Sequence, residues 1–336
     1  MAYTTINDPT AYFQTKLYTG NGGTNAITFD GNSNLSPDFV WLKMRSDADN
    51  HTLFNTTSGV GKRLFSNLTQ AESTESTSLT AFGSNGFTLG ADAIANANSK
   101  TFASWNWKET ADAGFDIVSY SGNSSNRTIS HSLSAIPQVM IVKELSGNSA
   151  GGNQAWSFYH KDTPLNKRLI LNTTEAATDD NPTTDWNETR PTSSVFTVGN
   201  SNRTNNSSGT YIAYLFAEKK GYSKFGSYTG NGNADGTFIY TGFKPSWIMI
   251  KRFDSGSSAG WLMFDNKRLG YNGGNSFLEA HVDAAENSNE RIDILSNGFK
   301  CRSTTQVNNA SGGTYIYMTF ASEPFVTSTG VPATAR

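Results

Sequence analysis

Two sequence motifs each occur three times in the chain, with successive copies about one hundred residues apart. A repeat of about 20 to 50 residues is typical of solenoids and propellers, whereas a unit of this length can close a core of its own. The repetition therefore predicts three tandem units in a chain of 336 residues. The motifs are Tyr18-Thr19-Gly20-Asn21, Tyr120-Ser121-Gly122-Asn123 and Tyr228-Thr229-Gly230-Asn231, and the proline-led apolar segments 37–43, 137–143 and 245–251.

The composition excludes several classes of protein. Charged residues make up 16% of the chain, against roughly 25% in ordinary globular proteins. The net charge of −2 does not suit a nucleic acid or an anionic membrane surface as partner. Apolar runs stay below the ~18 to 20 residues that a membrane span needs, and residues 1–5 lack signal-peptide features. We expect neither membrane insertion nor signal-dependent export.

The single cysteine, Cys301, excludes a disulfide within the chain and any metal site made of paired cysteines. Alternation places Lys300 and Arg302 on the opposite face of a strand, so the thiol lacks an activating neighbour. We expect Cys301 to be packed in a strand. We expect no cofactor.

Each unit contains at least five strand-like phrases that are rich in β-branched and aromatic residues and are separated by polar turns. This pattern predicts an all-β fold of three tandem antiparallel β-sandwich repeats, of jelly-roll or lectin-like type. The last phrase of unit one places Ala103, Trp105 and Trp107 on one face, where core packing is favoured over stacking on sugars. The predicted segments are an N-terminal docking arm at 1–14, repeats at 15–110, 115–219 and 222–324, and a C-terminal tail at 325–336.

The arm has no counterpart in the other two units, and it contains Asp8, Pro9, Tyr12 and Phe13. An unrepeated segment of this kind suggests docking onto a neighbouring protein. A strand or cap that folds back on its own chain is an equal alternative.

Catalytic groups do not recur with the repeats. The four histidines fall at unmatched positions, and the acidic cluster Asp179, Asp180, Asp185 and Glu188 lies in one polar loop of one unit. We interpret this cluster as a solvated loop; the alternatives are a carboxylate pair for glycoside hydrolysis and an oxygen-ligand site for Ca²⁺. The sequence therefore predicts a protein that is not an enzyme.

Two features remain as candidate contact residues. A Lys-Arg pair precedes a leucine in every unit, and we favour a structural role in which each arginine ties down a loop. The alternative is a cationic patch that grips acidic glycans or an anionic neighbour. Trp186 is alone in a polar loop and is the better candidate for an exposed contact. The pairs are Lys62 and Arg63, Lys167 and Arg168, and Lys267 and Arg268.

Several of these phrases resemble a known family. Residues 1–14, the Tyr-Thr-Gly-Asn phrase, Trp41-Leu42-Lys43, residues 84–90 and Trp105-Asn106-Trp107-Lys108 together resemble repeat-containing virion proteins of marine tailed bacteriophages, which infect cyanobacteria and other ocean bacteria. The resemblance covers nearly the whole chain, and unit two departs from it at residues 191–196, where the Asn-Gly turn is missing. It implies a structural or tail-fibre-like role and a lectin-like sandwich, and it supplies no catalytic or binding residues.

We therefore expect a non-enzymatic virion surface protein, tail-fibre-like or head-decorating, that acts by rigid multivalent contacts. Its expected location is the virion, its expected partners are other capsid or tail proteins, and it is expected to form a homo-oligomer there. A carbohydrate-binding adhesin that contacts a host-surface glycan is the alternative, and a polysaccharide-degrading spike is a weaker one.

Overall fold

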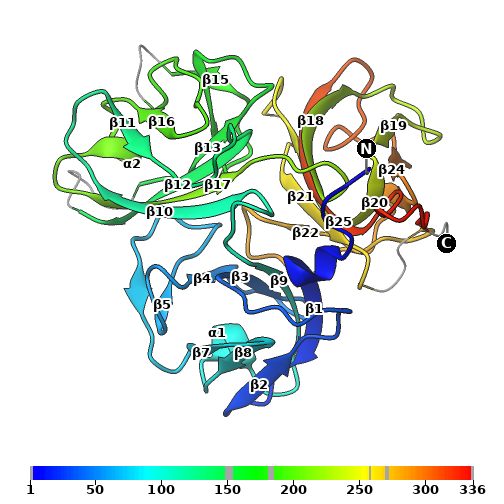
Figure 1. Ribbon diagram of the computed structural model, residues 1–336, viewed down its shortest axis with the longest axis horizontal. Coiled ribbons are helices and arrows are strands. Elements are labelled where there is room, and N and C mark those ends of the chain that lie inside the picture. The colour runs from blue at the N-terminus through cyan, green and yellow to red at the C-terminus, as the bar shows by residue number, and fades with distance from the viewer. Residues whose placement is uncertain (1–2, 148–153, 181–184, 257–258, 269–271, 334–336) are drawn as a thin grey trace.

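The computed structural model describes residues 3–147, 154–180, 185–256, 259–268 and 272–333 (Figure 1). It confirms the all-β prediction, because strands in antiparallel sheets dominate the described chain. The described helices are single turns: η1 (Pro9–Ala11), α1 (Ala93–Asn96) and α2 (Asn202–Asn205).

Three large sheets share one strand order. The first is β1 (Phe13–Thr19), β9 (Thr101–Trp107), β3 (Phe39–Met44) and β4 (Thr52–Asn55). The second is β10 (Phe115–Ser121), β17 (Thr210–Phe216), β12 (Val139–Ser146), β13 (Ser157–His160), β14 (Lys167–Ile170) and β15 (Thr178–Asp179). The third is β18 (Ser223–Thr229), β25 (Thr314–Pro324), β20 (Phe243–Arg252), β21 (Trp261–Asp265) and β22 (Leu278–Glu279). The proline-led segment thus becomes an inner strand in each sheet.

A smaller sheet accompanies each large one. These sheets are β2 (Asn25–Thr28), β8 (Gly86–Leu89) and β7 (Leu79–Gly83); β11 (Arg127–Ser130) and β16 (Val195–Val198); and β19 (Phe238–Tyr240), β24 (Gly298–Cys301) and β23 (Ile292–Leu295). A further pair joins β5 (Lys62–Arg63) to β6 (Ser73–Thr74). The hairpins β7–β8 and β23–β24 turn at Ser84-Asn85 and Ser296-Asn297. The second unit lacks the Asn-Gly sequence, and its described small sheet lacks this hairpin.

We call the three groups of sheets the first, second and third lobes. They surround a common centre, as Figure 1 shows. Lobe-specific clusters fill the space between the large and small sheets, for example with Val40, Leu42 and Phe87 in the first lobe. The expected sandwich core therefore exists in each lobe.

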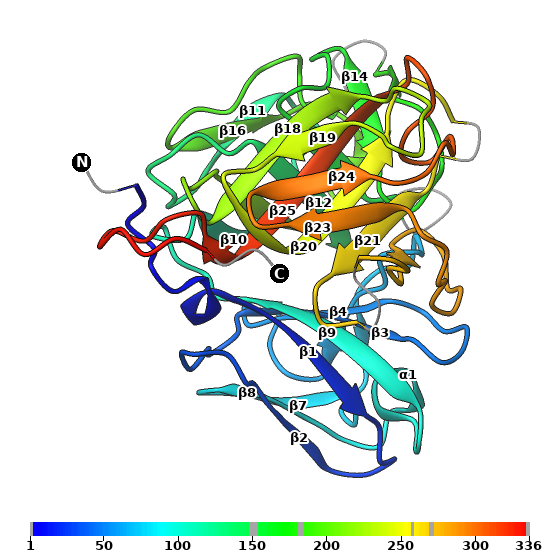
Figure 2. The same ribbon diagram turned by 90° about the vertical axis from the view of Figure 1, so that its right-hand side faces the viewer.

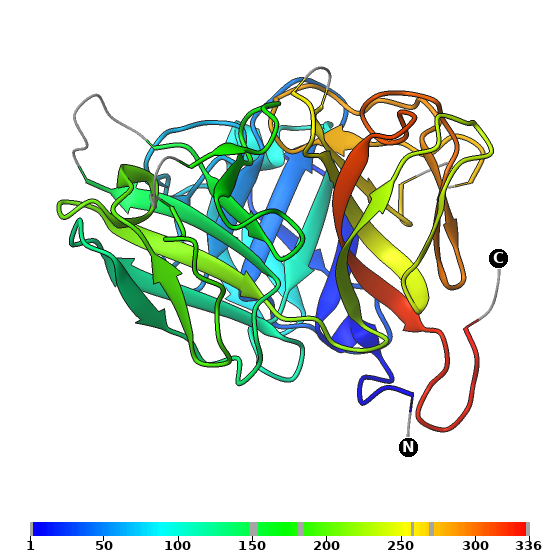
Figure 3. The same ribbon diagram turned by 90° about the horizontal axis from the view of Figure 1, so that it is seen from above.

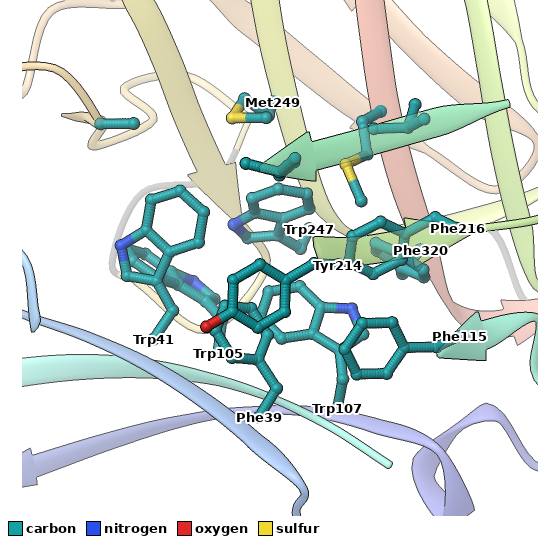
Figure 4. Packing of buried hydrophobic residues seen from close by; sticks show 14 of the residues in the cluster. Phe39, Trp41, Trp105, Trp107, Phe115, Tyr214, Phe216, Trp247, Met249 and Phe320 are labelled. Atoms are coloured by element: carbon teal, nitrogen blue, oxygen red, sulfur yellow. The ribbon is translucent and has the colours of Figure 1, made fainter. Parts of the chain in front are cut away.

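The opposite faces of the three large sheets meet in a central cluster (Figure 4). Trp41 lies in it although Val40 and Leu42 belong to the first lobe's own cluster, because side chains alternate along a strand. The face of Trp105 and Trp107, 0% and 1% exposed, is part of this centre, so core packing is confirmed. The lobes are thus not self-contained, since their largest apolar faces are removed from water only by one another.

The repeated Tyr-x-Gly-Asn phrase is explained by a buried asparagine in each lobe. In the first lobe, the Tyr18 hydroxyl donates to the carbonyl of Ala95, at 2.7 Å. The adjacent Asn96 is fully buried and accepts from the Asn21 amide at 3.0 Å. A Cβ on Gly20 would lie 2.1 Å from the carbonyl oxygen of Ala97, so only glycine fits there.

The same arrangement recurs in the other lobes. Tyr120 and Tyr228 donate to the carbonyls of Thr204 and Asn308, each at 2.7 Å. Asn205 and Asn309 are also fully buried and hold the Gly-Asn turns of their lobes. The phrase is therefore a folding element, in which one buried amide fastens the end of the first strand to the loop before the last strand.

We predict that Asn96→Ala lowers the free energy of unfolding by about 3 kcal/mol, because the Asn96 side chain donates to two carbonyls, of Gly23 and Gly90, that would lose a partner. Asn98→Ala, at an exposed position two residues later, is the matched control. Urea unfolding of both variants measures the difference. Equal stabilities would contradict the role assigned to Asn96.

Candidate functional site

The Lys-Arg pairs of the first two lobes occupy equivalent positions and make intramolecular ion pairs. Arg63 contacts Asp92, the N-cap of α1, at 2.6 Å, and Arg168 contacts Asp180 at 3.2 Å. Lys167 pairs with Asp179 at 2.9 Å, and Lys62 donates to the Thr74 hydroxyl at 2.8 Å. These contacts support the structural interpretation, in which the arginines tie down loops.

The third Lys-Arg pair is not equivalent to the other two, so the prediction of three matching pairs is wrong. Leu64 and Leu169 pair with Leu53 and Phe158, and the counterpart of these leucines in the third lobe is Leu278, which pairs with Met263. Lys267-Arg268 resembles the other two pairs in sequence, but it follows β21 and lies at a different position in the fold.

Arg268 instead follows β21 and is 1% exposed. Its Nε lies 2.7 Å from Asp265 Oδ2, and its Nη1 lies 3.4 Å from Glu286 Oε2. Arg268 is thus part of a buried ion-pair network, while Lys267 is half exposed and pairs with Asp30 of the first lobe at 3.4 Å.

Trp186 is a second correction. It is 2% exposed and packs in the core of the second lobe, with its ring centroid 5.7 Å from that of Tyr159. The polar sequence around Trp186 does not expose it, and the neighbouring Asp185 is itself buried. Trp186 is therefore unsuited to an exposed contact.

The acidic loop of the second lobe is not simply solvated. Asp180 and Asp185 are 6% and 0% exposed, and Arg203 contacts both, at 3.3 and 3.0 Å. Burial raises the pKa of Asp185, although Arg203 opposes the rise. Asp179 and Glu188 are exposed. Within the described ranges, no group of three or more histidine, cysteine or carboxylate side chains is arranged to hold a metal ion.

The N-terminal arm folds back on its own chain, which is the alternative to docking on a neighbour. Asp8 caps η1 and accepts from the Ser33 hydroxyl at 2.5 Å, and Pro9 is buried. Tyr12 and Phe13 pack against aromatic rings of the third lobe, with Phe13 5.3 Å from Phe320. Figures 2 and 3 show this segment beside the C-terminal one. The four residues assigned to docking are thus engaged within the chain.

Each contact between neighbouring lobes, which we call a seam, contains a buried lysine. These lysines are at most 1% exposed, and they are Lys43, Lys143 and Lys251. Lys143 of the second lobe donates to Thr69 O of the first at 3.1 Å, and Lys251 of the third donates to Thr174 O of the second at 2.9 Å. At the third–first seam, Lys43 donates to carbonyls of its own lobe. The sequence marked these lysines as repeated without indicating their seam positions.

An indole or imidazole occupies a second equivalent position at each seam. Trp156 Nε1 donates to Phe65 O at 2.9 Å, and Trp261 Nε1 donates to Ile170 O at 3.1 Å. His51 takes this place at the third–first seam, with Nε2 3.0 Å from Glu279 O. Its Nδ1 accepts from Trp41 Nε1 at 3.0 Å, so the ring is neutral with its proton on Nε2. Burial lowers the pKa of His51 well below its usual value, in agreement with this tautomer.

One exposed feature was missed by the sequence analysis. Phe238 and Tyr240 are 44% and 51% exposed, and they flank the buried Ile239 on β19, an edge strand of the third lobe. The equivalent positions of the other lobes are Ala26 and Thr28, and Thr128 and Ser130. The Tyr3 hydroxyl lies near Tyr240, and Lys220 Nζ lies 4.7 Å from the Tyr3 ring centroid. We call Phe238 and Tyr240 of the third lobe, together with Tyr3 of the N-terminal arm and Lys220 of the segment before β18, the aromatic patch.

The fold and the seams define the class: an all-β protein whose three antiparallel lobes are joined by a shared aromatic core. The chain belongs to the family described as "Domain of unknown function (DUF7483)", whose model matches residues 8–324. No curated protein matches the sequence. Among the described residues, no helix is both long and apolar enough to cross a membrane.

The buried lysines predict that stability rises with pH above neutrality. Burial lowers the pKa of Lys43 and Lys143 to about 8 and of Lys251 to about 7, whereas the unfolded chain has the ordinary lysine value of 10.5. Between these values the unfolded chain binds a proton that the folded chain has released, so the free energy of unfolding increases as the pH rises. We expect an increase of about 1 to 2 kcal/mol for Lys251 between pH 7 and pH 9.

Denaturant unfolding at pH 7, 8 and 9 measures this slope. Lys251→Met should reduce the slope, and Lys108→Met, at an exposed position, should leave it unchanged. The comparison ends at pH 9 because the buried Cys301, whose pKa is raised to about 11, opposes the trend at higher pH. A variant with the wild-type slope would contradict a depressed pKa at Lys251.

Proposed function

We propose that this protein is a non-enzymatic structural protein of a bacteriophage particle, displayed on the surface of the tail or head. The observation that carries the proposal is the shared core, which makes three lobes into one rigid body. Central residues such as Trp107, Phe216 and Phe320 come from different lobes and lie within 6.4 Å of one another by ring centroid. A rigid body of three similar lobes presents several contacts at fixed spacing, which raises avidity without a strong single site.

The polar seams support the same proposal. Seams made of buried lysines, indoles and carbonyls resist separation, because each broken contact leaves a buried polar group without a partner. The folded-back arm adds further links: Tyr3 donates to Gly242 O at 2.6 Å, and Thr4 donates to Lys220 O at 2.7 Å. Such a body suits a permanent part of a particle. The phage assignment itself rests on the resemblance of the sequence to marine phage virion proteins.

The location of the protein tests this proposal. Antibodies raised against the purified chain should label intact, gradient-purified particles of the phage that encodes it, as seen by immunogold electron microscopy. The same grids distinguish tail from head. Label that stays with the host lysate and is absent from the particles would refute a virion role.

A second candidate function, binding to a host-surface glycan, is favoured by the aromatic patch. Exposed aromatic rings on a rigid edge strand offer apolar faces to sugar rings, and the exposed pair Phe238 and Tyr240 belongs to the third lobe. The exposed positions of β2 and β11 carry small side chains instead. Within the virion proposal, this patch would be the part of the surface that touches the host.

We predict that the double variant Phe238→Ala and Tyr240→Ala lowers binding to a glycan array by about tenfold or more, since each ring contact contributes about 1 kcal/mol. Thr128→Ala with Ser130→Ala alters the equivalent positions of the second lobe and serves as the matched control. Equal signals from the two variants would exclude the patch as the binding surface.

A further inference from the structure

A cavity of about 220 Å³ lies at the third–first seam. Thr15 of β1 lines it from the first lobe, while Lys244, Ser246, Asn266, Lys267 and Ser322 line it from the third. The cavity has room for on the order of seven waters, or for a ligand the size of one sugar ring. Its lining is polar, in contrast to the aromatic centre of the molecule beside it.

The other two seams show what this position holds elsewhere. At the first–second seam, Glu109 Oε1 accepts from the backbone N–H of Ile117 at 3.0 Å. At the second–third seam, Glu218 Oε2 accepts from the backbone N–H of Phe225 at 3.4 Å. In both cases a carboxyl group reaches the outer edge of the next lobe's first strand and satisfies an amide there.

The third–first seam lacks this carboxyl group. The glutamates stand two residues after Trp107 and Phe216, and the residue two after the matching Phe320 is Ser322. Ser322 is shorter than glutamate, and its hydroxyl donates to Lys244 O on the neighbouring strand at 3.1 Å. The cavity therefore occupies the space that a glutamate side chain fills at the other two seams.

Thr15 is the residue of the first lobe that is equivalent to Ile117 and Phe225, whose backbone N–H groups donate to the glutamates. It pairs with Trp105 in the register in which Ile117 pairs with Tyr214 and Phe225 with Met318. Among the described residues, no side chain accepts from the Thr15 amide. The Thr15 hydroxyl is also buried without a hydrogen-bond partner, and the residue is 2% exposed. An unpartnered buried polar group of this kind destabilises the fold unless a bound group supplies the missing partner.

One positive charge at the cavity, that of Lys244, is available to balance an anion. Lys244 and Lys267 line it, and Lys244 has no ion-pair partner within the described part of the chain. Of the two lining carboxylates, Asp30 already pairs with Lys16 and Lys267, at 3.1 and 3.4 Å, and Glu323 is exposed. At the first–second seam the neighbouring charges are negative instead. Burial and the nearby Asp116 and Asp38 raise the pKa of Glu109 there to about 7.

We propose that this cavity binds a small carboxylate carried by a sugar, that is, an acidic monosaccharide. The ligand's carboxylate takes the place that Glu109 and Glu218 fill at the other seams and accepts from the Thr15 amide and hydroxyl. Lys244 supplies the balancing charge. The side chains of Ser246 and Asn266 face the sugar hydroxyls. The site is separate from the aromatic patch and does not depend on a virion role.

Binding of D-glucuronate, measured by isothermal titration calorimetry, tests the proposal, with D-glucose as the neutral control. We expect glucuronate to bind at least tenfold more tightly than glucose. Acetate should bind more weakly than glucuronate, which distinguishes recognition of the sugar from recognition of the carboxylate alone. Glucuronate that binds no better than glucose would overturn the proposal.

Two variants locate the site. Ser322→Glu restores the side chain found at the other seams, so it should weaken glucuronate binding at least tenfold and raise the melting temperature. Lys244→Met should weaken binding several-fold, whereas Lys108→Met should not. If Ser322→Glu does not fold, Thr15→Val replaces it and should weaken binding several-fold. Wild-type affinity in the folded variant that is tested would overturn the proposal.

Discussion

The burial of one aromatic face from each large sheet in a common centre is the interaction on which the rest of the structure depends. These faces carry residues such as Trp105, Tyr214 and Met318 at matching registers. A sheet with such a face exposed would lose tens of kcal/mol of apolar burial summed over its large side chains. The three lobes are therefore held together by the same effect that forms each lobe, and the chain behaves as one body.

The seams turn this nonspecific attraction into a fixed arrangement. An apolar centre alone tolerates sliding, whereas a buried indole or lysine that must reach one particular carbonyl does not. The last residue of β4, β13 and β21 is polar in each lobe, but its hydrogen-bond partner differs between the lobes. Asn55 donates to the Tyr214 hydroxyl at 3.1 Å, and His160 lies 3.3 Å from Tyr317 O. Asp265 accepts from Trp105 Nε1 at 3.0 Å and also balances the charge of Arg268.

Both proposed contact sites lie where one lobe departs from the repeat. The repeated residues take part in folding and in contacts between lobes. They include the Tyr-x-Gly-Asn motif and the seam lysines. Two of the positions at which one lobe differs are the aromatic pair of β19 and Ser322. Ser322 leaves a space at a position where the other seams have a glutamate, and the aromatic pair replaces the small exposed side chains of β2 and β11. The candidate contacts chosen for their recurrence, such as Arg63 and Arg168, make ion pairs within the chain, which supports a structural role for them.

The sequence by itself determined the five strands that recur in each lobe, such as β1, β3 and β9 in the first, because periodicity and turn residues are local properties. It did not predict the short strands β2, β11 and β19. It correctly placed Trp105 and Trp107 in a core and Cys301 in a buried strand. Only the tertiary structure decided that Trp186 is covered, that Lys267 and Arg268 do not match the earlier pairs, and that the N-terminal arm folds back on the third lobe. These outcomes depend on which distant residues meet, and pairing between residues far apart in the chain is not encoded in any local pattern.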